Sequence, residues 1–249
     1  MKGRKQMPSF NYGTTTIDYN LIRNPQTDSV SIAVEWQNGV TVTAPDSLPI
    51  DAINSTLYKK GTWILNKWHE VNEIVEPPIP KEYVSGEKFA YLGRHYKLKV
   101  LKDDTVKSVS VGLYRGRFIA YVPNNQSQKE QLDELYIAFK QWYLLHGQAK
   151  VQERLNHYEQ IMGLTANKLS LKEQKMRWGT CTKEGAIYLN WRITMAPVSV
   201  IDYVLVHELA HLKYPDHSNE FWRFVQSILP DFEQRKEWLR INGPKLTID

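Results

Sequence analysis

The sequence predicts an α+β fold, in which an antiparallel β-rich N-terminal part precedes a mostly helical part with a small sheet. Two observations carry this prediction. Residues 14–45 and 88–122 alternate polar and apolar side chains in short runs separated by turn residues, as half-buried strands do. From residue 128 onward, apolar residues recur mainly at helical spacing. We therefore expect two parts, residues 1–125 and 126–249, and no internal repeat is apparent along the chain.

The N-terminal part opens with a basic segment that lacks an apolar stretch. It is therefore not a secretory signal, and we expect roughly the first 13 residues to be mobile. Two alternating runs, residues 30–36 and 40–44, flank an Asn38-Gly39 dipeptide that is typical of hairpins. Residues 50–74 carry apolar side chains at helical spacing. This predicts one helix, weakened by Gly61 and ended by the prolines that follow.

A second β block and a long helix follow. Strands are predicted over residues 88–92, 95–101, 106–114 and 117–122. Connections this short favour antiparallel hairpins. The helical pattern from Gln128 to Met162 is long for one element, so we expect a break near Gly147, and Gly163 is placed to cap the C-terminus.

Composition bounds the class of protein. Of 249 residues, 42% are hydrophobic and 24% are charged, which is ordinary for a globular chain. The formal net charge of +5 permits an acidic partner or substrate without requiring one. A single cysteine, Cys181, excludes an internal disulfide framework and fits a reducing compartment. Because no apolar run approaches the roughly 18 residues of a membrane span, we expect a cytoplasmic protein with no membrane partner.

The helical part contains the stretch with the clearest chemistry. Strands are predicted over residues 168–172 and 186–192. They lead into a helix that should begin near Pro197 or Ser199 and end before Pro215.

Two histidines on this helix are placed to bind one metal ion. His207 and His211 are four residues apart and so lie on one face of the helix. Two imidazoles in this arrangement can bind one Zn²⁺ at about 2.0–2.1 Å each, and Glu208 beside them can act on a water molecule. A charged glutamate among apolar helix residues is costly unless it has such a partner. The pattern predicts a zinc site with Glu208 as the catalytic base.

The third ligand is less constrained by spacing. A catalytic zinc takes three protein ligands and keeps a fourth position open. His217 follows at short range and is the favoured third ligand, although Pro215 must turn the chain to bring it back toward the helical pair. Carboxylates farther along are the alternatives: Glu220, Glu233 and Glu237.

Other residues are candidate binding groups. Arg177 could stabilise a developing oxyanion or bind an anionic substrate, and capping a turn or pairing with a core carboxylate is an equally good interpretation. Trp178 fits packing better than substrate contact. Basic residues also gather on the predicted hairpins, where a solvated strand face is the first interpretation and a nucleic-acid surface the alternative: Lys99, Lys102, Lys107, Arg115 and Arg117.

Three segments carry a resemblance to a known family. They read MRWGTC with IYLN, then DYVLVHELAHL, then HSNEFW, at residues 176–181 with 187–190, 202–212 and 217–222. On these segments the chain resembles the YgjP-like metallopeptidases, which are related to the SprT-like zincins. The resemblance covers roughly residues 160–240, and the family usually has serine where this chain has Thr180.

The resemblance implies a zincin-like catalytic part. It implies that one Zn²⁺ is held by three histidines, that Glu208 is catalytic, and that the Arg-Trp-Gly segment packs near the site. The implied ligands are His207, His211 and His217.

Three functions are compatible with these residues. The first is a zinc-dependent metallopeptidase that acts on a peptide or protein. The second, implied by the resemblance, is a metal-dependent pyrophosphatase acting on a nucleotide, UTP, although the sequence has no glycine-rich phosphate loop. The third is a DNA-associated protease of the SprT-like kind, in which the β-rich part binds nucleic acid.

Overall fold

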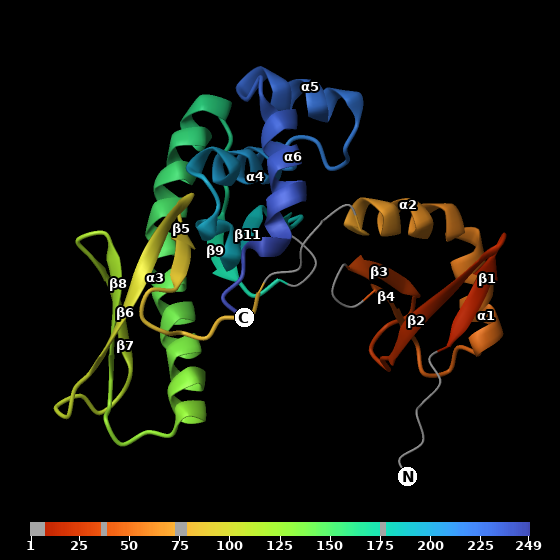
Figure 1. Ribbon diagram of the computed structural model, residues 1–249. Coiled ribbons are helices and arrows are strands. Elements are labelled where there is room, and N and C mark those ends of the chain that lie inside the picture. The colour runs from red at the N-terminus through yellow and green to blue at the C-terminus, as the bar shows by residue number, and fades with distance from the viewer. Residues whose placement is uncertain (1–7, 36–38, 73–78, 175–177) are drawn as a thin grey trace, which may run out of the picture. The chain divides into compact units, whose positions relative to one another are not determined.

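The computed structural model describes residues 8–35, 39–72, 79–174 and 178–249, and the chain divides into two compact units (Figure 1). The units comprise residues 1–77 and 78–249. The predicted boundary near residue 125 therefore falls inside the second unit. The sheet before that point packs on the helix after it, because the rings of Phe89 and Phe118 lie 4.3 and 5.2 Å from that of Phe139.

The first unit is a four-stranded sheet with two helices. Its elements are β1 (Ser9–Tyr12), β2 (Thr15–Arg23), β3 (Ser31–Glu35), β4 (Gly39–Ala44), α1 (Ile50–Lys59) and α2 (Gly61–Asn72). Strand β1 occupies residues expected to belong to a mobile segment, and residues 1–7 lie outside the described residues. Strands β3 and β4 form the expected antiparallel pair, and residues 36–38 of its turn lie outside the described residues.

The single helix expected over residues 50–74 is two helices, divided at Lys60. The cause is a close approach at Gly61, where a Cβ would lie 2.2 Å from the ring of Tyr12. That ring occupies the space that a side chain at this position would need.

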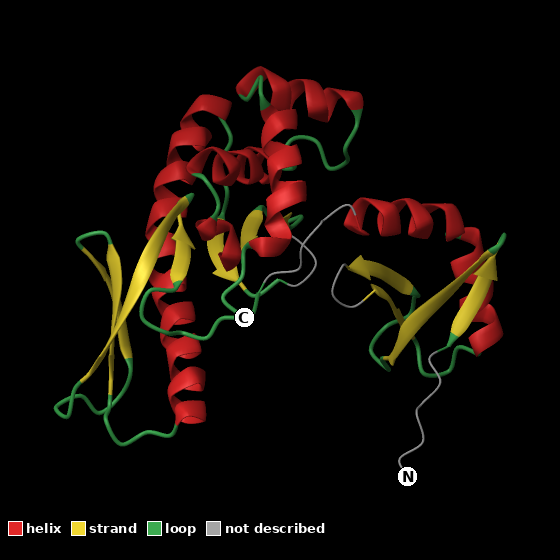
Figure 2. Cartoon of the chain, viewed as in Figure 1, coloured by secondary structure: helices red, strands yellow, loops and turns green. Residues whose placement is uncertain are grey.

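The second unit holds the remaining elements (Figure 2). They are β5 (Lys88–Tyr91), β6 (Arg94–Lys102), β7 (Ser110–Tyr114), β8 (Arg117–Val122), α3 (Gln128–Met162), β9 (Lys168–Lys172), β10 (Gly179–Cys181), β11 (Ala186–Asn190), α4 (Val198–Ala210), α5 (Asn219–Ile228) and α6 (Phe232–Asn242), with 3-10 helices η1 (Trp191–Met195) and η2 (Gly243–Lys245). This mixture of sheets and helices is the expected α+β class.

Helix α3 runs the length of the second unit without a break. Ser127 and Glu130 form a capping box at its start, and Gly163 ends it with a left-handed φ of 63°. The break expected near Gly147 is absent, because this glycine serves a close contact: a Cβ there would lie 2.5 Å from Cγ2 of Thr194. The sheet β5–β8 packs along the N-terminal half of α3 and α4 crosses its C-terminal half (Figure 1).

Strand pairing differs from the all-antiparallel expectation. The four-stranded sheets have the orders β1-β2-β4-β3 and β5-β6-β8-β7, so β2 pairs with β4, and β6 with β8, in parallel. In each sheet the third strand along the chain lies at an edge, and the fourth strand lies between it and the second strand. The small sheet, β10-β11-β9, likewise contains a parallel pair, β9 with β11.

The two four-stranded sheets are an internal structural repeat. Their strands have matching lengths of 4, 9, 5 and 6 residues, and β1, β2 and β3 start 79 residues before β5, β6 and β7. The registers also match: Phe10 faces Ile17 as Phe89 faces Tyr96. Few of the matched residues are identical, so the repeat was not apparent from the sequence.

Each unit has a separate hydrophobic core among the described residues. The core of the second unit is continuous from the β5–β8 sheet to helices α4, α5 and α6. None of the helices in the described part of the chain combines the length and apolar character that spanning a bilayer requires.

Candidate metal centre

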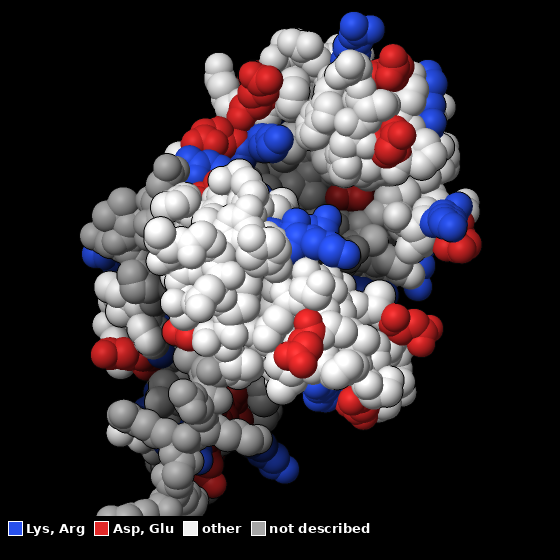
Figure 3. All heavy atoms as spheres, turned by 90° about the vertical axis from the view of Figure 1, so that its right-hand side faces the viewer, with Lys and Arg blue, Asp and Glu red and all other residues white. Residues whose placement is uncertain are grey.

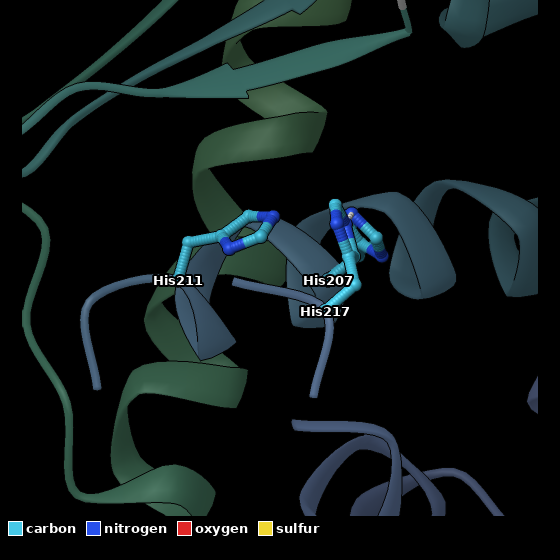
Figure 4. Close-up of side chains that lie close together, drawn as sticks. All are labelled: His207, His211 and His217. Carbon is cyan, nitrogen blue, oxygen red and sulfur yellow. Dashed lines mark hydrogen bonds between the residues drawn. The ribbon is translucent and has the colours of Figure 1, made fainter. Parts of the chain in front are cut away.

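Three histidines converge in the second unit (Figure 4). His207 lies in the last turn of α4, His211 caps that helix, and His217 lies in the loop before α5. One ligand atom from each of them lies within 4.8 Å of the other two. The Nε2 atoms of His207 and His217 are 3.0 Å apart, so the turn after α4 does bring the third imidazole back to the helical pair.

Local capping fixes the position of His217. The next residue, Ser218, is the N-cap of α5, and its side chain accepts a hydrogen bond from the main-chain N–H of Phe221. Residues with a short polar side chain are favoured at this position because they satisfy one of the free N–H groups of the first turn. The end of one helix and the start of the next thus hold the three imidazoles.

Hydrogen bonding orients His211 toward a ligand. Its Nδ1 lies 3.1 Å from the carbonyl oxygen of Tyr214. Since a carbonyl can only accept, Nδ1 must carry the proton, and Nε2 then presents its lone pair to the other two histidines. A second hydrogen bond of this kind is typical of imidazoles that bind metals.

The environment of His207 keeps its ring neutral. Burial lowers the pKa of His207 to about 3, and the nearby His211, His217 and Lys236 add to this effect. Burial is also the largest cause that lowers the pKa of His217. Neutral imidazoles are the form that can donate to a cation. Three such nitrogens, two of them 3.0 Å apart, fit a tetrahedral ion, whose ligand atoms at about 2.0–2.1 Å would be separated by roughly 3.3 Å.

Glu208 lies beside this cluster and is buried, with only 6% of its surface exposed. Strand β10 passes directly against it. A Cβ on Gly179 would lie 2.4 Å from Oε1 of Glu208, so this position has room for glycine alone. Gly179 belongs to the Arg-Trp-Gly segment that the family resemblance placed near the site, but its tight contact with the glutamate could not be predicted from spacing along the sequence.

Aromatic rings form the base of the cluster and were not predicted as site residues. Phe221 is fully buried, and its ring lies 5.0, 4.7 and 4.9 Å from those of the three histidines. Trp222 stacks on His217 at 5.6 Å, with an interplanar angle of 24°. Both residues belong to the HSNEFW segment that carries the family resemblance, and both fall in the first turn of α5, but neither signal assigned them a place at the site.

The helix that carries two of the histidines is anchored to α3. Arg154 donates two hydrogen bonds to the carboxylate of Asp202, at 2.7 and 2.9 Å. Asp202 is buried, with 6% of its surface exposed. Two parallel bonds of this kind fix both distance and orientation, so this pair sets the position of α4 against α3.

The other predicted site residues have different places. The rival carboxylates Glu220, Glu233 and Glu237 are not in the cluster, and within the described residues only the three histidines form a group able to hold a metal ion. Trp178 is half-buried and packs on Gly243, where a Cβ would lie 2.8 Å from the indole. Arg177 lies outside the described residues.

Strand β10 offers an open edge beside Glu208. Among the described strands it pairs only with β11, and it is therefore the terminal strand of its sheet. The main-chain groups of Trp178 and Thr182 bond to β11. Because bonding alternates along an antiparallel pair, those of Gly179 and Cys181 point to the open edge.

The opposite edge of the same sheet is covered. The side-chain amide of Gln148, from α3, donates to the carbonyl of Leu169 at 3.2 Å and accepts from the N–H of Leu171 at 2.9 Å. Covering of this kind prevents pairing along β9. Within the described residues, the free edge of the small sheet is therefore the one beside the histidine cluster.

Two comparisons with known proteins found similarities. The family model of the YgjP-like metallopeptidase domain matches residues 28–242. A solved structure, the crystal structure of the metallopeptidase zymogen of Pyrococcus abyssi abylysin, is 33% identical over 35% of this chain and 86% of that chain, with a TM-score of 0.32. No curated protein matches the chain.

Proposed function

The chain belongs to the YgjP-like metallopeptidase family, and on that premise we propose that it is a zinc-dependent peptidase. The observation that carries the proposal is the convergence of three imidazoles beside a buried glutamate. His207, His211 and His217 would hold one Zn²⁺. When bound, the ion supplies a Lewis acid that polarises the scissile carbonyl and makes a water molecule more acidic.

Glu208 performs the proton transfers. Its carboxylate accepts a proton from the attacking water and returns it to the nitrogen of the leaving amine. Phe221 beneath the imidazoles and Gly179 against the carboxylate leave these groups little room to move. The fixed position favours attack, because a small displacement of a catalytic group is costly in rate.

The open edge of β10 is the proposed binding site for the peptide. An extended chain would pair with the main-chain groups of Gly179 and Cys181 and so bring a peptide bond to Glu208. Pairing of this kind uses every second amide of the substrate. When the main-chain nitrogens of a substrate peptide are methylated one at a time, hydrolysis should therefore be weakened only at every second position. An equal effect of methylation at all positions would contradict strand pairing.

The test of the function is Glu208→Gln, with Glu220→Gln on the exposed start of α5 as the matched control. Hydrolysis of a casein-derived peptide panel should fall by at least about a hundredfold in the first variant, because the proton acceptor is lost. Metal content should stay unchanged, and the control should retain full activity. Full turnover in Glu208→Gln would overturn the mechanism. Turnover of UTP in place of peptides, abolished by chelator, would support the pyrophosphatase instead.

A further inference from the structure

The β5–β8 sheet has one face on α3, and none of the described elements of the second unit covers its other face (Figure 1). Side chains alternate between the two faces along each strand. Phe118, Ala120 and Val122 of β8 are fully buried and therefore mark the face toward α3. The opposite side is the outer face.

Every charged side chain at an outward position of the four strands is a cation. These cations are Lys88, Lys97, Lys99 and Arg117, and all four are exposed. No carboxylate occupies an outward position of these four strands, each of which is described throughout. On the side of the molecule that faces the viewer in Figure 3, by contrast, Lys and Arg are interspersed with Asp and Glu. We call the outer face, defined by these four cations with Tyr114 and Tyr121, the basic face.

Register places three of the cations in one row. Lys88 pairs with Lys97, and Lys97 pairs with Arg117. Like charges directly opposite each other destabilise a sheet. None of the three forms a salt bridge with another described residue. Within the described residues, no salt bridge therefore offsets the repulsion expected among these three cations.

The internal repeat shows that the fold does not require this charge. In the first sheet, the positions equivalent to Lys88, Lys97 and Arg117 are Ser9, Asp18 and Gly39. Both sheets have the same register and strand lengths. The cations are thus a property of the second sheet's surface, independent of its architecture.

Aromatic rings lie among the cations. Tyr114 pairs with Arg117 across the sheet and is 58% exposed, and Tyr121 on the same face is 40% exposed. The guanidinium of Arg115 lies 5.1 Å from the ring centroid of Tyr114. Exposed aromatic rings can stack on unpaired bases while cations contact the phosphates. A base-paired duplex could use the cations but could not stack on the rings.

From this combination we propose that the basic face binds single-stranded nucleic acid. The phosphates contact the row formed by Lys88, Lys97 and Arg117, and bases stack on Tyr114 and Tyr121. The proposal is independent of the metal centre, since none of its residues contributes to the histidine cluster.

The test uses the full chain and a fluorescent 15-nucleotide oligothymidylate, with a duplex of equal length as the second probe. Fluorescence anisotropy at stepped salt concentrations measures affinity. The unmodified protein should bind the single strand more tightly than the duplex. Affinity should fall with salt, because contacts with phosphates release counterions.

The variant Lys97→Glu/Arg117→Glu should weaken binding at least about tenfold and flatten the salt dependence by roughly 0.7 per lost phosphate contact. Tyr121→Ala should weaken single-strand binding alone. Lys59→Glu/Lys60→Glu, in the first unit, gives the same change in net charge and should leave affinity unchanged. Lys97→Gln/Arg117→Gln replaces the first variant if melting shows that it is misfolded. No binding at low salt, preference for the duplex, or equal loss in the Lys59/Lys60 control would overturn the proposal.

Discussion

The two sheets of this protein have the same strand lengths and register but lead to different structures. The first is followed by two short helices, α1 and α2, and forms a unit with its own core. The second is followed by the single helix α3, which continues into the core around the metal centre. In both sheets the matched core position of the first strand is a phenylalanine, Phe10 or Phe89.

The comparison separates what specifies the sheet from what specifies function. Buried alternate positions are apolar in both sheets, as Val40, Val42 and Ala44 match Phe118, Ala120 and Val122. Outward positions and the helix that follows are free to differ. The three histidines and Glu208, which we propose to be the catalytic groups, all lie beyond the second sheet along the chain. We therefore expect the first sheet to be dispensable for metal binding and the second to be essential.

The largest expected effect comes from the two matched phenylalanines. Phe89→Ala should destabilise the second unit by about 3–5 kcal/mol, because it leaves a cavity among stacked rings, and the metal should be lost with the fold. Phe10→Ala should lower only the transition of the first unit. Calorimetry with metal analysis on both variants measures this. Loss of metal in Phe10→Ala would show that the two cores are not separate.

A smaller effect is expected at the anchor of α4, which the first unit lacks. Asp202→Asn should destabilise the second unit by about 1.5–3 kcal/mol, because the partly buried guanidinium of Arg154 loses its charged partner. The melting temperature of the second unit measures the loss. Glu153→Gln, which removes an exposed carboxylate from the same helix, is the control and should have little effect.

The smallest expected effect is a loss of stability of the second unit at acidic pH. Burial alone would raise the pKa of Glu173, but hydrogen bonds from Lys140, Arg192 and Trp191 outweigh it and lower the pKa to about 2. A depressed pKa contributes stability that is present above the ordinary value of 4.5 and is lost as pH falls toward 2. The second unit should lose stability over this range, and Glu173→Gln should reduce that loss. If stability fell with pH in Glu173→Gln as it does in the unmodified protein, this prediction would be wrong.

The sequence was informative where the relevant residues are close together along the chain. His207, His211 and His217 lie within eleven positions, and the structure brings them together. That they bind zinc stays a prediction. The contact between Gly179 and Glu208 joins two segments that only the tertiary fold places side by side, and no periodicity could show it.

The division into units was harder to predict for a similar reason. Alternation marks a strand but not the helix on which it packs. The sheet before residue 125 belongs with α3 because Phe89, Phe118 and Phe139 share one core. The prediction of a break near Gly147 was wrong. A glycine within a helix can allow close packing, here against Thr194, and does not always end the helix.

The central claim, a metal centre of three histidines, is tested most directly by the zinc content of purified His217→Ala. The unmodified protein should carry one zinc per chain. Removal of the third imidazole should lower zinc content and affinity strongly while the fold, held by Ser218 and Phe221, remains. His157→Ala, at an exposed position on α3, should retain its zinc. Unmodified protein without zinc, or His217→Ala with undiminished zinc affinity, would contradict the claim.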